Sequence, residues 1–205
     1  MAQPKKLFRF SPKTLRGETI ALGDPKNVTV LNRINFQHCT VSINCSAQGL
    51  VIKDCTFEDC LIGAKKAQSD QQFFTSTFER CKFVGEFWGC EFGFRNNLHG
   101  KTRGTILDCD FAQAMLDWVS FNNCDLNTLK LPRWPHFTVT TPGTTAKRIP
   151  NPRGCDEIET LRSTCLDQAP ITKGITCYAP FLLEETIYTD DELRQLLSGV
   201  AGILL

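Results

Sequence analysis

Large apolar residues recur at every fifth position in the stretch from Gly104 to Leu131. They are Ile106, Phe111, Leu116, Phe121, Leu126 and Leu131. Two residues before each one stands a smaller or apolar side chain, at Gly104, Cys109, Ala114, Val119, Cys124 and Leu129. A period of five matches neither the 3.6-residue period of an amphipathic helix nor the two-residue period of a half-buried strand. The pattern therefore indicates an internal repeat.

The same phase runs through the first half of the chain. Five blocks superpose: 34–41, 55–62, 76–83, 104–111 and 124–131. The columns of this superposition hold Phe36, Phe57, Phe78, Ile106 and Leu126; Val41, Ile62, Phe83, Phe111 and Leu131; and Cys39, Cys60, Cys81, Cys109 and Leu129. Between the blocks, residues 63–72 break the apolar pattern, which predicts a loop or a loosened wall.

These units resemble those of the pentapeptide-repeat family, which read roughly small-polar-Leu/Phe-x-x. The resemblance covers residues 28–131. It implies that the central residue and the residue two before it point inward, and that four units make one square turn. We therefore expect a mainly β fold, a right-handed quadrilateral parallel β-helix of about five turns with a small α-containing C-terminal extension.

Two segments flank the predicted β-helix. Residues 1–27 are basic and interrupted by prolines, and they are predicted to form an N-terminal cap or a flexible arm. A cap is favoured because the open end of a solenoid exposes apolar side chains and unpaired strand edges. Residues 132–205 lie beyond the repeat, and we expect a linker strand, HFTV, followed by a helical C-terminal cap.

The C-terminal extension carries two helix signals. Residues 155–166 place Ile158, Leu161 and Cys165 on one helical face. Further on, Thr189 and Glu192 have the spacing of a capping box. An apolar stripe follows, made of Leu193, Leu196, Leu197, Val200 and Leu204. This last helix is expected to cap the last turn; the alternative is a homodimer, since related pentapeptide-repeat proteins can pair through C-terminal helices.

Composition limits the classes of partner. The net charge is +1 and the pI is near 7.5, so no general attraction to nucleic acid or to an anionic membrane is expected. No run approaches the roughly 20 apolar residues of a membrane span. The opening MAQPKKLFRF lacks the apolar core of a signal peptide. We therefore expect a cytoplasmic protein.

The eleven cysteines are expected to fill the interior as free thiols. The repeat phase places Cys39, Cys60, Cys81, Cys109, Cys55, Cys90 and Cys124 inward, and free cysteine packs as a small hydrophobe. Stacked neighbours would lie close enough for disulfides. An odd total without a secretion signal favours reduced thiols, and the spacing does not suit zinc. We expect neither metal nor cofactor.

Catalytic signatures are missing from the sequence. It contains no Gly-rich phosphate loop, no nucleophile elbow and no pair of histidines at ligand spacing. The three histidines, His38, His99 and His136, have no evident catalytic partner. A rigid solenoid presents surfaces for recognition, so we expect a protein that is not an enzyme.

Two tryptophans are predicted at outward corners of adjacent turns. Trp88 follows an inward position, and Trp118 stands two places after the inward Leu116. Clusters of exposed tryptophan mark interaction sites, although the C-terminal region or a nearby loop would equally cover both rings. The inserted loop 93–103 is either part of a binding side or idle surface. The predicted partner-binding residues are Trp88, Trp118, Arg95, His99, Lys101, Arg103 and Asp117.

Three functions are compatible with these features. The preferred hypothesis is a bacterial immunity protein that binds and neutralises a toxin. The first alternative comes from the resemblance, since one branch of the family mimics DNA and protects DNA gyrase. That mimicry needs an acidic helix, whereas residues 28–131 hold ten Lys/Arg and eleven Asp/Glu. The second alternative is a structural scaffold that self-associates.

Overall fold

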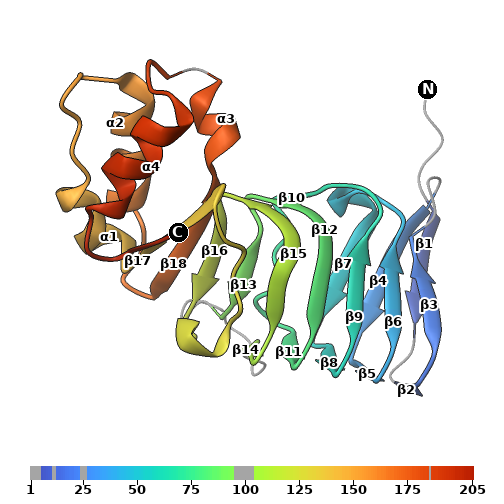
Figure 1. Cartoon of the computed structure of the whole chain (residues 1–205). Coiled ribbons are helices and arrows are strands. Elements are labelled where there is room, and N and C mark those ends of the chain that lie inside the picture. The colour runs from blue at the N-terminus through green and yellow to red at the C-terminus, as the bar shows by residue number, and fades with distance from the viewer. Residues whose placement is uncertain (1–5, 11–12, 24–26, 95–103, 185) are drawn as a thin grey trace, which may run out of the picture.

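The five-residue pattern folds as a stack of short parallel strands. The structure, a computed structural model, describes residues 6–10, 13–23, 27–94, 104–184 and 186–205, with the backbone alone for 6–10. The strand triplets β1–β3, β4–β6 and β7–β9 each add one strand to each of three sheets (Figure 1). The result is a parallel β-solenoid of about three regular turns, followed by less regular strands and a small helical part. The expected mainly β solenoid is confirmed at this level.

Three sheets form the walls of the solenoid. The first contains β1 (Lys6–Phe10), β4 (Asn27–Asn32) and β7 (Leu50–Lys53). The second contains β2 (Lys13–Arg16), β5 (Ile34–Gln37), β8 (Thr56–Glu58), β11 (Thr77–Glu79) and β14 (Ile106–Leu107). The third contains β3 (Thr19–Leu22), β6 (Thr40–Ile43), β9 (Leu61–Ala64), β10 (Gln68–Ser69), β12 (Lys82–Trp88) and β15 (Asp110–Asp117).

The ladders begin inside the segment predicted as a cap or an arm. Strands β1, β2 and β3 lie within residues 1–27 and pair in parallel with β4, β5 and β6. A one-turn 3₁₀ helix, η1 (Ala47–Gly49), precedes β7. The first described turn therefore has the same strand pattern as the turns that follow it.

The aligned columns predicted from the sequence are strand partners. Phe57 pairs with Phe36 on one side and with Phe78 on the other, and Phe78 pairs with Ile106. The rings of Phe36 and Phe57 stack with centroids 4.5 Å apart. Offset stacking of this kind adds about 0.5–1.5 kcal/mol beyond area burial. The fifth block departs from the column, because Leu126 lies in a 3₁₀ helix, η2 (Leu126–Thr128).

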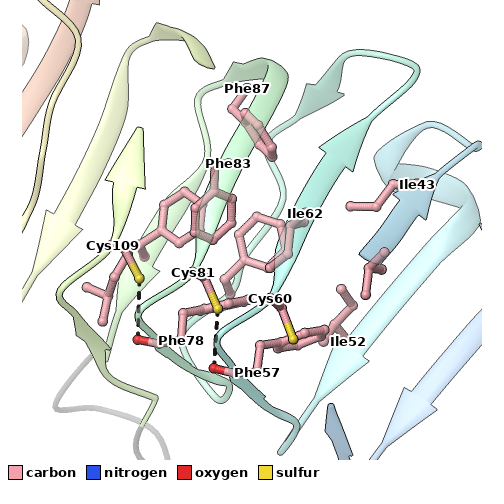
Figure 2. Packing of buried hydrophobic residues seen from close by; sticks show 14 of the residues in the cluster. Ile43, Ile52, Phe57, Cys60, Ile62, Phe78, Cys81, Phe83, Phe87 and Cys109 are labelled. Atoms are coloured by element: carbon pink, nitrogen blue, oxygen red, sulfur yellow. Dashed lines mark hydrogen bonds between the residues drawn. The ribbon is translucent and has the colours of Figure 1, made fainter. Parts of the chain in front are cut away.

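The cysteine column forms a ladder of thiols inside the solenoid (Figure 2). Cys60, Cys81 and Cys109 are buried, and each Sγ donates a hydrogen bond to a backbone carbonyl of the preceding turn. The carbonyl acceptors belong to Phe36, Phe57 and Phe78. All eleven cysteines are free, and ten of them are buried. The predicted packing role is confirmed, and the thiol hydrogen bonds are an addition to it.

Residues 63–72 are more ordered than the broken apolar pattern predicts. Gln68 in β10 pairs with Phe87 and its side chain is fully buried. Its Nε2 donates to the carbonyl oxygens of Cys45 at 2.8 Å and Lys66 at 2.9 Å. A polar side chain therefore takes an inward position here, where backbone carbonyls satisfy its amide NH2 group while its Oε1 stays buried without a hydrogen-bond partner.

The C-terminal region continues the last solenoid strands as a mixed sheet. This sheet has the order β13-β16-β18-β17-β19. Its strands are β13 (Glu91–Gly93), β16 (Val119–Asn122), β17 (His136–Thr140), β18 (Thr172–Tyr178) and β19 (Ile203–Leu204). Because β18 pairs antiparallel with β16, the chain after the repeat folds back onto the solenoid and covers its edge.

Helices gather beside this sheet at one end of the molecule (Figure 1). They are α1 (Pro142–Thr145), η3 (Ala146–Arg148), α2 (Asp156–Leu166), α3 (Ala179–Leu183) and α4 (Asp190–Ser198). Together with β17 and β18 they enclose a second hydrophobic core, separate from the solenoid interior. The predicted strand after the repeat and the predicted helix at 155–166 are both confirmed.

The last helix differs in part from its prediction. The capping box of Thr189 and Glu192 is present, and Leu193 and Leu197 are buried in the second core. The placement of Leu204 on the helix is wrong, since α4 ends at Ser198 and Leu204 lies in β19 with its side chain half exposed. Strand β18 pairs with β16 at the end of the solenoid, so the covering of this strand includes an element that the sequence did not predict.

Candidate protein-binding surface

Trp88 and Asp117 are neighbours on adjacent turns of the solenoid. Trp88 ends β12, Asp117 ends β15, and the two residues pair directly. Trp118 follows at the corner, so the predicted proximity of the two tryptophans along the stack is present. Their environments differ. Trp88 is 36 % exposed, whereas Trp118 is half-buried and packs against the second core.

Trp118 adopts a backbone conformation that is unusual for a bulky residue. Its φ is +52°, and Gly89, at the equivalent corner after β12, has a φ of +59°. The left-handed conformation costs a residue with a Cβ about 1–2 kcal/mol. Packing of the indole against the second core holds Trp118 in this conformation. The corner therefore directs the indole toward the C-terminal helices.

A line of aromatic rings extends from Trp88 into the C-terminal region. The Trp88 ring meets Phe181 of α3 edge to face, with centroids 5.9 Å apart. Phe181 in turn meets Tyr178 of β18 at 5.3 Å, and Tyr178 contacts His136 at 4.7 Å. Phe181 is 37 % exposed. We call the exposed pair Trp88 and Phe181 the aromatic edge.

A cavity of about 240 Å³ opens beside the aromatic edge. Four aromatic residues line it, namely Trp118, Phe137, Tyr178 and Phe181. Three acidic residues share the lining, namely Asp117, Asp156 and Glu157. The walls come from β15, β17, β18, α2 and α3, so the cavity exists only because the C-terminal region folds back onto the solenoid.

Asp117 links the two parts of the molecule. Its Oδ1 accepts a hydrogen bond from the backbone N–H of Tyr178 at 2.9 Å. Burial raises the pKa of this carboxyl group, and the Tyr178 hydrogen bond opposes that rise. Asp117 is one of the predicted partner-binding residues, and in the structure it also anchors β18.

His136 is a structural residue beside this surface. Its Nε2 accepts the backbone N–H of Leu116 at 3.2 Å, and burial lowers the pKa of the imidazole. Both features favour the neutral form at physiological pH. In the described residues, no group of three or more His, Cys, Asp or Glu side chains is arranged to hold a metal ion.

Four of the predicted partner-binding residues cannot be placed on this surface. Arg95, His99, Lys101 and Arg103 lie outside the described residues, so their contribution stays a prediction. The structure brings together Trp88, Trp118 and Asp117. It adds Tyr178 and Phe181, which the sequence analysis missed because they stand outside the repeat and carry no periodic signal.

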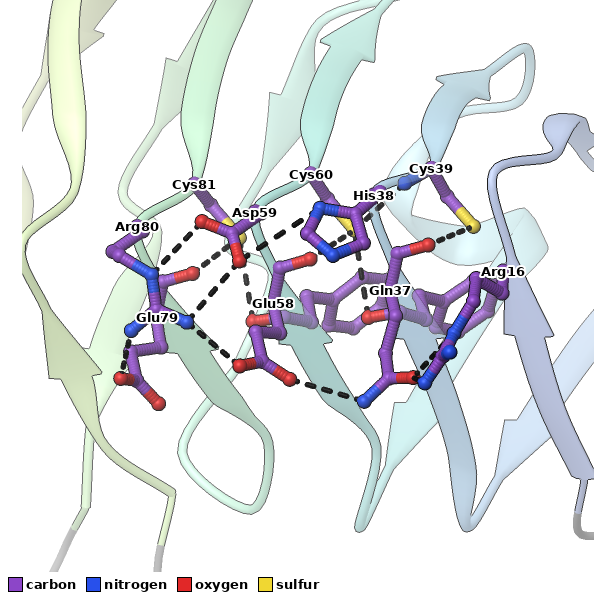
Figure 3. Close-up of polar contacts among 12 residues, drawn as sticks. Arg16, Gln37, His38, Cys39, Glu58, Asp59, Cys60, Glu79, Arg80 and Cys81 are labelled. Carbon is purple, nitrogen blue, oxygen red and sulfur yellow. Dashed lines mark hydrogen bonds and ion pairs between the residues drawn. The ribbon is translucent and has the colours of Figure 1, made fainter.

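A second polar surface follows the corners of the second sheet (Figure 3). Gln37 accepts a hydrogen bond from Arg16 and donates one to Glu58. Arg80 then pairs with Glu58 at 2.7 Å and with Asp59 at 2.8 Å. Its hydrogen bond to Asp59 lowers the pKa of that carboxyl group. Because Arg80 pairs with both carboxylates, the charges of this surface neutralise one another and the surface is not strongly acidic.

No model of a known protein family matches the sequence, and no curated protein matches it either. None of the described helices is both long enough and apolar enough to cross a membrane.

Proposed function

We propose that this chain is a non-catalytic protein-binding module, and that its partner binds at the aromatic edge. The observation that carries the proposal is the exposure of Trp88 and Phe181 side by side at the junction of the solenoid with the C-terminal region. Tryptophan and other aromatic residues supply much of the binding energy of protein interfaces. Their exposure on a rigid scaffold favours recognition over catalysis.

The form of the surface supports this proposal. Trp88 stands at a strand end and Phe181 on the helix that directly follows β18, so both rings are held by regular structure. Preordered side chains lose little conformational entropy when a partner binds. A standard interface of about 800 Å² per partner would extend well beyond the aromatic edge. We propose Asp117 and Trp118, with Arg95, His99, Lys101 and Arg103, as its surroundings.

Within this class we propose a bacterial, cytoplasmic immunity protein that neutralises a toxin. A scaffold with an exposed aromatic surface suits a protein that acts by covering another protein's surface. The proposal of toxin neutralisation associates this role with a solenoid scaffold, because the fold alone does not imply the function. The identity of the bound partner decides whether the chain is an immunity protein.

The finer description of the solenoid is also a proposal. We propose that residues 28–131 are pentapeptide repeats forming a right-handed, four-sided helix of about five turns. Support comes from the second sheet, in which four strands from this range stack with Phe36, Phe57, Phe78 and Ile106 in one column. Further support comes from left-handed corner residues that recur with the repeat, among them His38, Asp59, Arg80 and Asp108.

The test is capture of the partner from native lysate with the tagged full chain. The Trp88→Ala/Phe181→Ala double variant should lose a stoichiometric partner that the parent chain retains. Val51→Ala is the matched control, because Val51 is an exposed apolar residue on β7, away from the aromatic edge. A toxin domain as the captured protein would establish the immunity role. Equal capture by the double variant would show that the partner binds elsewhere.

Two alternatives give different outcomes in the same experiment. Capture of DNA gyrase subunits would favour the DNA-mimic alternative, against the near balance of charge in residues 28–131. A scaffold that self-associates would capture its own untagged copy. A homodimer through α4 stays a prediction, although the buried leucines of this helix already pack inside the chain's own core.

A further inference from the structure

The cavity beside the aromatic edge combines two features that together select one class of ligand. Four aromatic rings and three carboxylate side chains line it, and the lining residues that the structure describes include no Lys or Arg. Aromatic faces attract cations through the ring quadrupole. Carboxylates attract them by charge. A neutral apolar ligand would use the rings only, and an anion would be repelled by the carboxylates.

We propose that this cavity binds an organic cation, an alkylammonium or guanidinium group, between Trp118, Tyr178 and Phe181 on one side and Asp156 and Glu157 on the other. The inference goes beyond the proposed protein-binding function and rests on it only for the source of the cation. A partner's lysine or arginine side chain is one source, and a free small amine is the other.

The size of the cavity suits a single such group. Its volume is about 240 Å³. A cavity of about 150 Å³ accommodates a benzene molecule, whereas typical sites for larger ligands begin near about 300 Å³. The end of one lysine or arginine side chain falls within this range. A nucleotide or a folded peptide does not.

The negative charge of Asp156 and Glu157 exceeds the partial positive charge at the start of α2. Asp156 and Glu157 occupy the first turn of α2, where the helix dipole places about half a positive charge. Two carboxylates in the same turn exceed that partial charge. The thiol of Cys155 donates to Glu157 Oε2 at 2.7 Å, and this hydrogen bond lowers the pKa of Glu157. Glu157 therefore carries its negative charge at neutral pH.

Probes of defined charge test the proposal without any partner protein. The full chain is titrated with blocked lysine, blocked arginine, blocked norleucine and free butylamine, while NMR follows the indole N–H of Trp118. We expect cationic probes to bind with dissociation constants on the order of 1 mM, at least about tenfold tighter than norleucine. Norleucine has a similar apolar stem without the charge.

Three variants separate the contributions. Asp156→Asn/Glu157→Gln keeps the side-chain sizes and should abolish the preference for cations. Phe181→Leu keeps an apolar side chain without the aromatic face, and it should weaken the binding of the cationic probes more than the binding of norleucine. Asp108→Asn removes an exposed acid at a solenoid corner, outside the cavity lining, and should change nothing.

Each outcome decides a point. The proposal would be overturned by any of three results. Norleucine binds as tightly as the cationic probes, the double acid variant keeps the preference for cations, or no probe gives a response at 20 mM. Tighter binding of the blocked amino acids than of butylamine would assign the cation to a partner's side chain, and the reverse order would assign it to a free amine. A captured partner without cation binding would leave the protein-binding function in place and remove this inference alone.

Discussion

Corner residues show how single positions fit the solenoid. His38, Asp59 and Arg80 have φ values of +52°, and the N–H of each donates to a backbone carbonyl of the next turn. Short polar residues such as Asp, Asn and His tolerate this conformation better than bulky ones. Arg80 and Trp118 are larger residues in the same conformation, and the Trp118 indole packs against the second core.

Asp117 gives a prediction at this scale. Asp117→Ala leaves the Tyr178 N–H without its acceptor, so unfolding should become about 1–3 kcal/mol easier. Asp117→Asn keeps an acceptor oxygen and should stay within about 1 kcal/mol of the parent. Urea denaturation at pH 7 measures both. Equal losses in the two variants would contradict the anchoring role of this hydrogen bond.

A further prediction concerns how the stability of the parent chain and of Asp117→Asn depends on pH. Burial raises the pKa of Asp117 in the folded state, so the folded state holds this proton to higher pH than the unfolded state. The contribution is fully present below the unfolded pKa and is lost as pH rises through the folded one. Asp117→Asn lacks this titration. Its stability relative to the parent should therefore improve between pH 3.5 and pH 7.

Cys90 gives the corresponding prediction at alkaline pH. Burial raises the pKa of its thiol to about 12, whereas a thiol in the unfolded chain ionises near its ordinary pKa of 9.0. The unfolded state loses this proton first, so the thiol's contribution to stability falls as pH rises from about 9 toward 12. Between pH 9 and pH 10 the free energy of unfolding should fall in both proteins. The fall should be smaller in Cys90→Ala than in the parent, by about 1 kcal/mol. Denaturation at the two pH values measures it, and equal losses in both proteins would contradict the prediction.

At the scale of elements, the repeat determines which strands stack, and Gly93 permits a close approach between two of them. Gly93 ends β13 with a φ of +82°, and a Cβ there would lie 1.9 Å from the backbone oxygen of Asn122. Gly63 is different, since its φ lies outside the positive region and a Cβ there would meet the Val41 oxygen at 3.9 Å.

Gly93→Ala should therefore separate β13 from β16 and destabilise the fold by more than about 2 kcal/mol. Gly63→Ala is the matched control and should change stability by less than about 1 kcal/mol. Thermal unfolding of both variants measures the difference. Similar melting temperatures for the two would show that the contact at Gly93 relaxes without cost.

The sequence pattern predicts the regular elements and fails where long-range contacts decide. The columns of Phe36, Phe57 and Phe78 follow from a five-residue period, because each turn repeats the same inward positions. Gln68 breaks that period, and its burial depends on carbonyls that no local pattern reveals. Likewise Leu204 has the spacing of the helical stripe, but Gly202, with a φ of +102°, turns the chain into β19.

The candidate surface was partly predictable for the same reason. The repeat phase places Trp88 outward and Trp118 at the following corner. It contains no information on Phe181, which lies 93 residues after Trp88 in the sequence and contacts it through the fold of the C-terminal region. The cavity could not be predicted from the sequence either, since strands and helices from both parts of the chain line it.

At the scale of the whole molecule, two cores share one sheet. The solenoid interior and the C-terminal core are separate clusters, and β18 joins them by pairing with β16 on one side and β17 on the other. An open solenoid end exposes unpaired strand groups that recruit other chains. The C-terminal region therefore serves as the end cap of the solenoid, and the cavity is a product of that capping.

Removal of this cap is the corresponding prediction. A chain ending at Leu131 lacks β18 and leaves the edge of β16 unpaired, so it should assemble into larger species than the full chain at equal concentration. A chain ending at Gly202 is the control, because it lacks only β19, which pairs with β17 and does not touch β16. Light scattering coupled to size exclusion measures both masses. A truncated chain that stays monomeric and unfolds cooperatively would show that the solenoid closes its own end, and β18 would then be an addition to the fold rather than its cap.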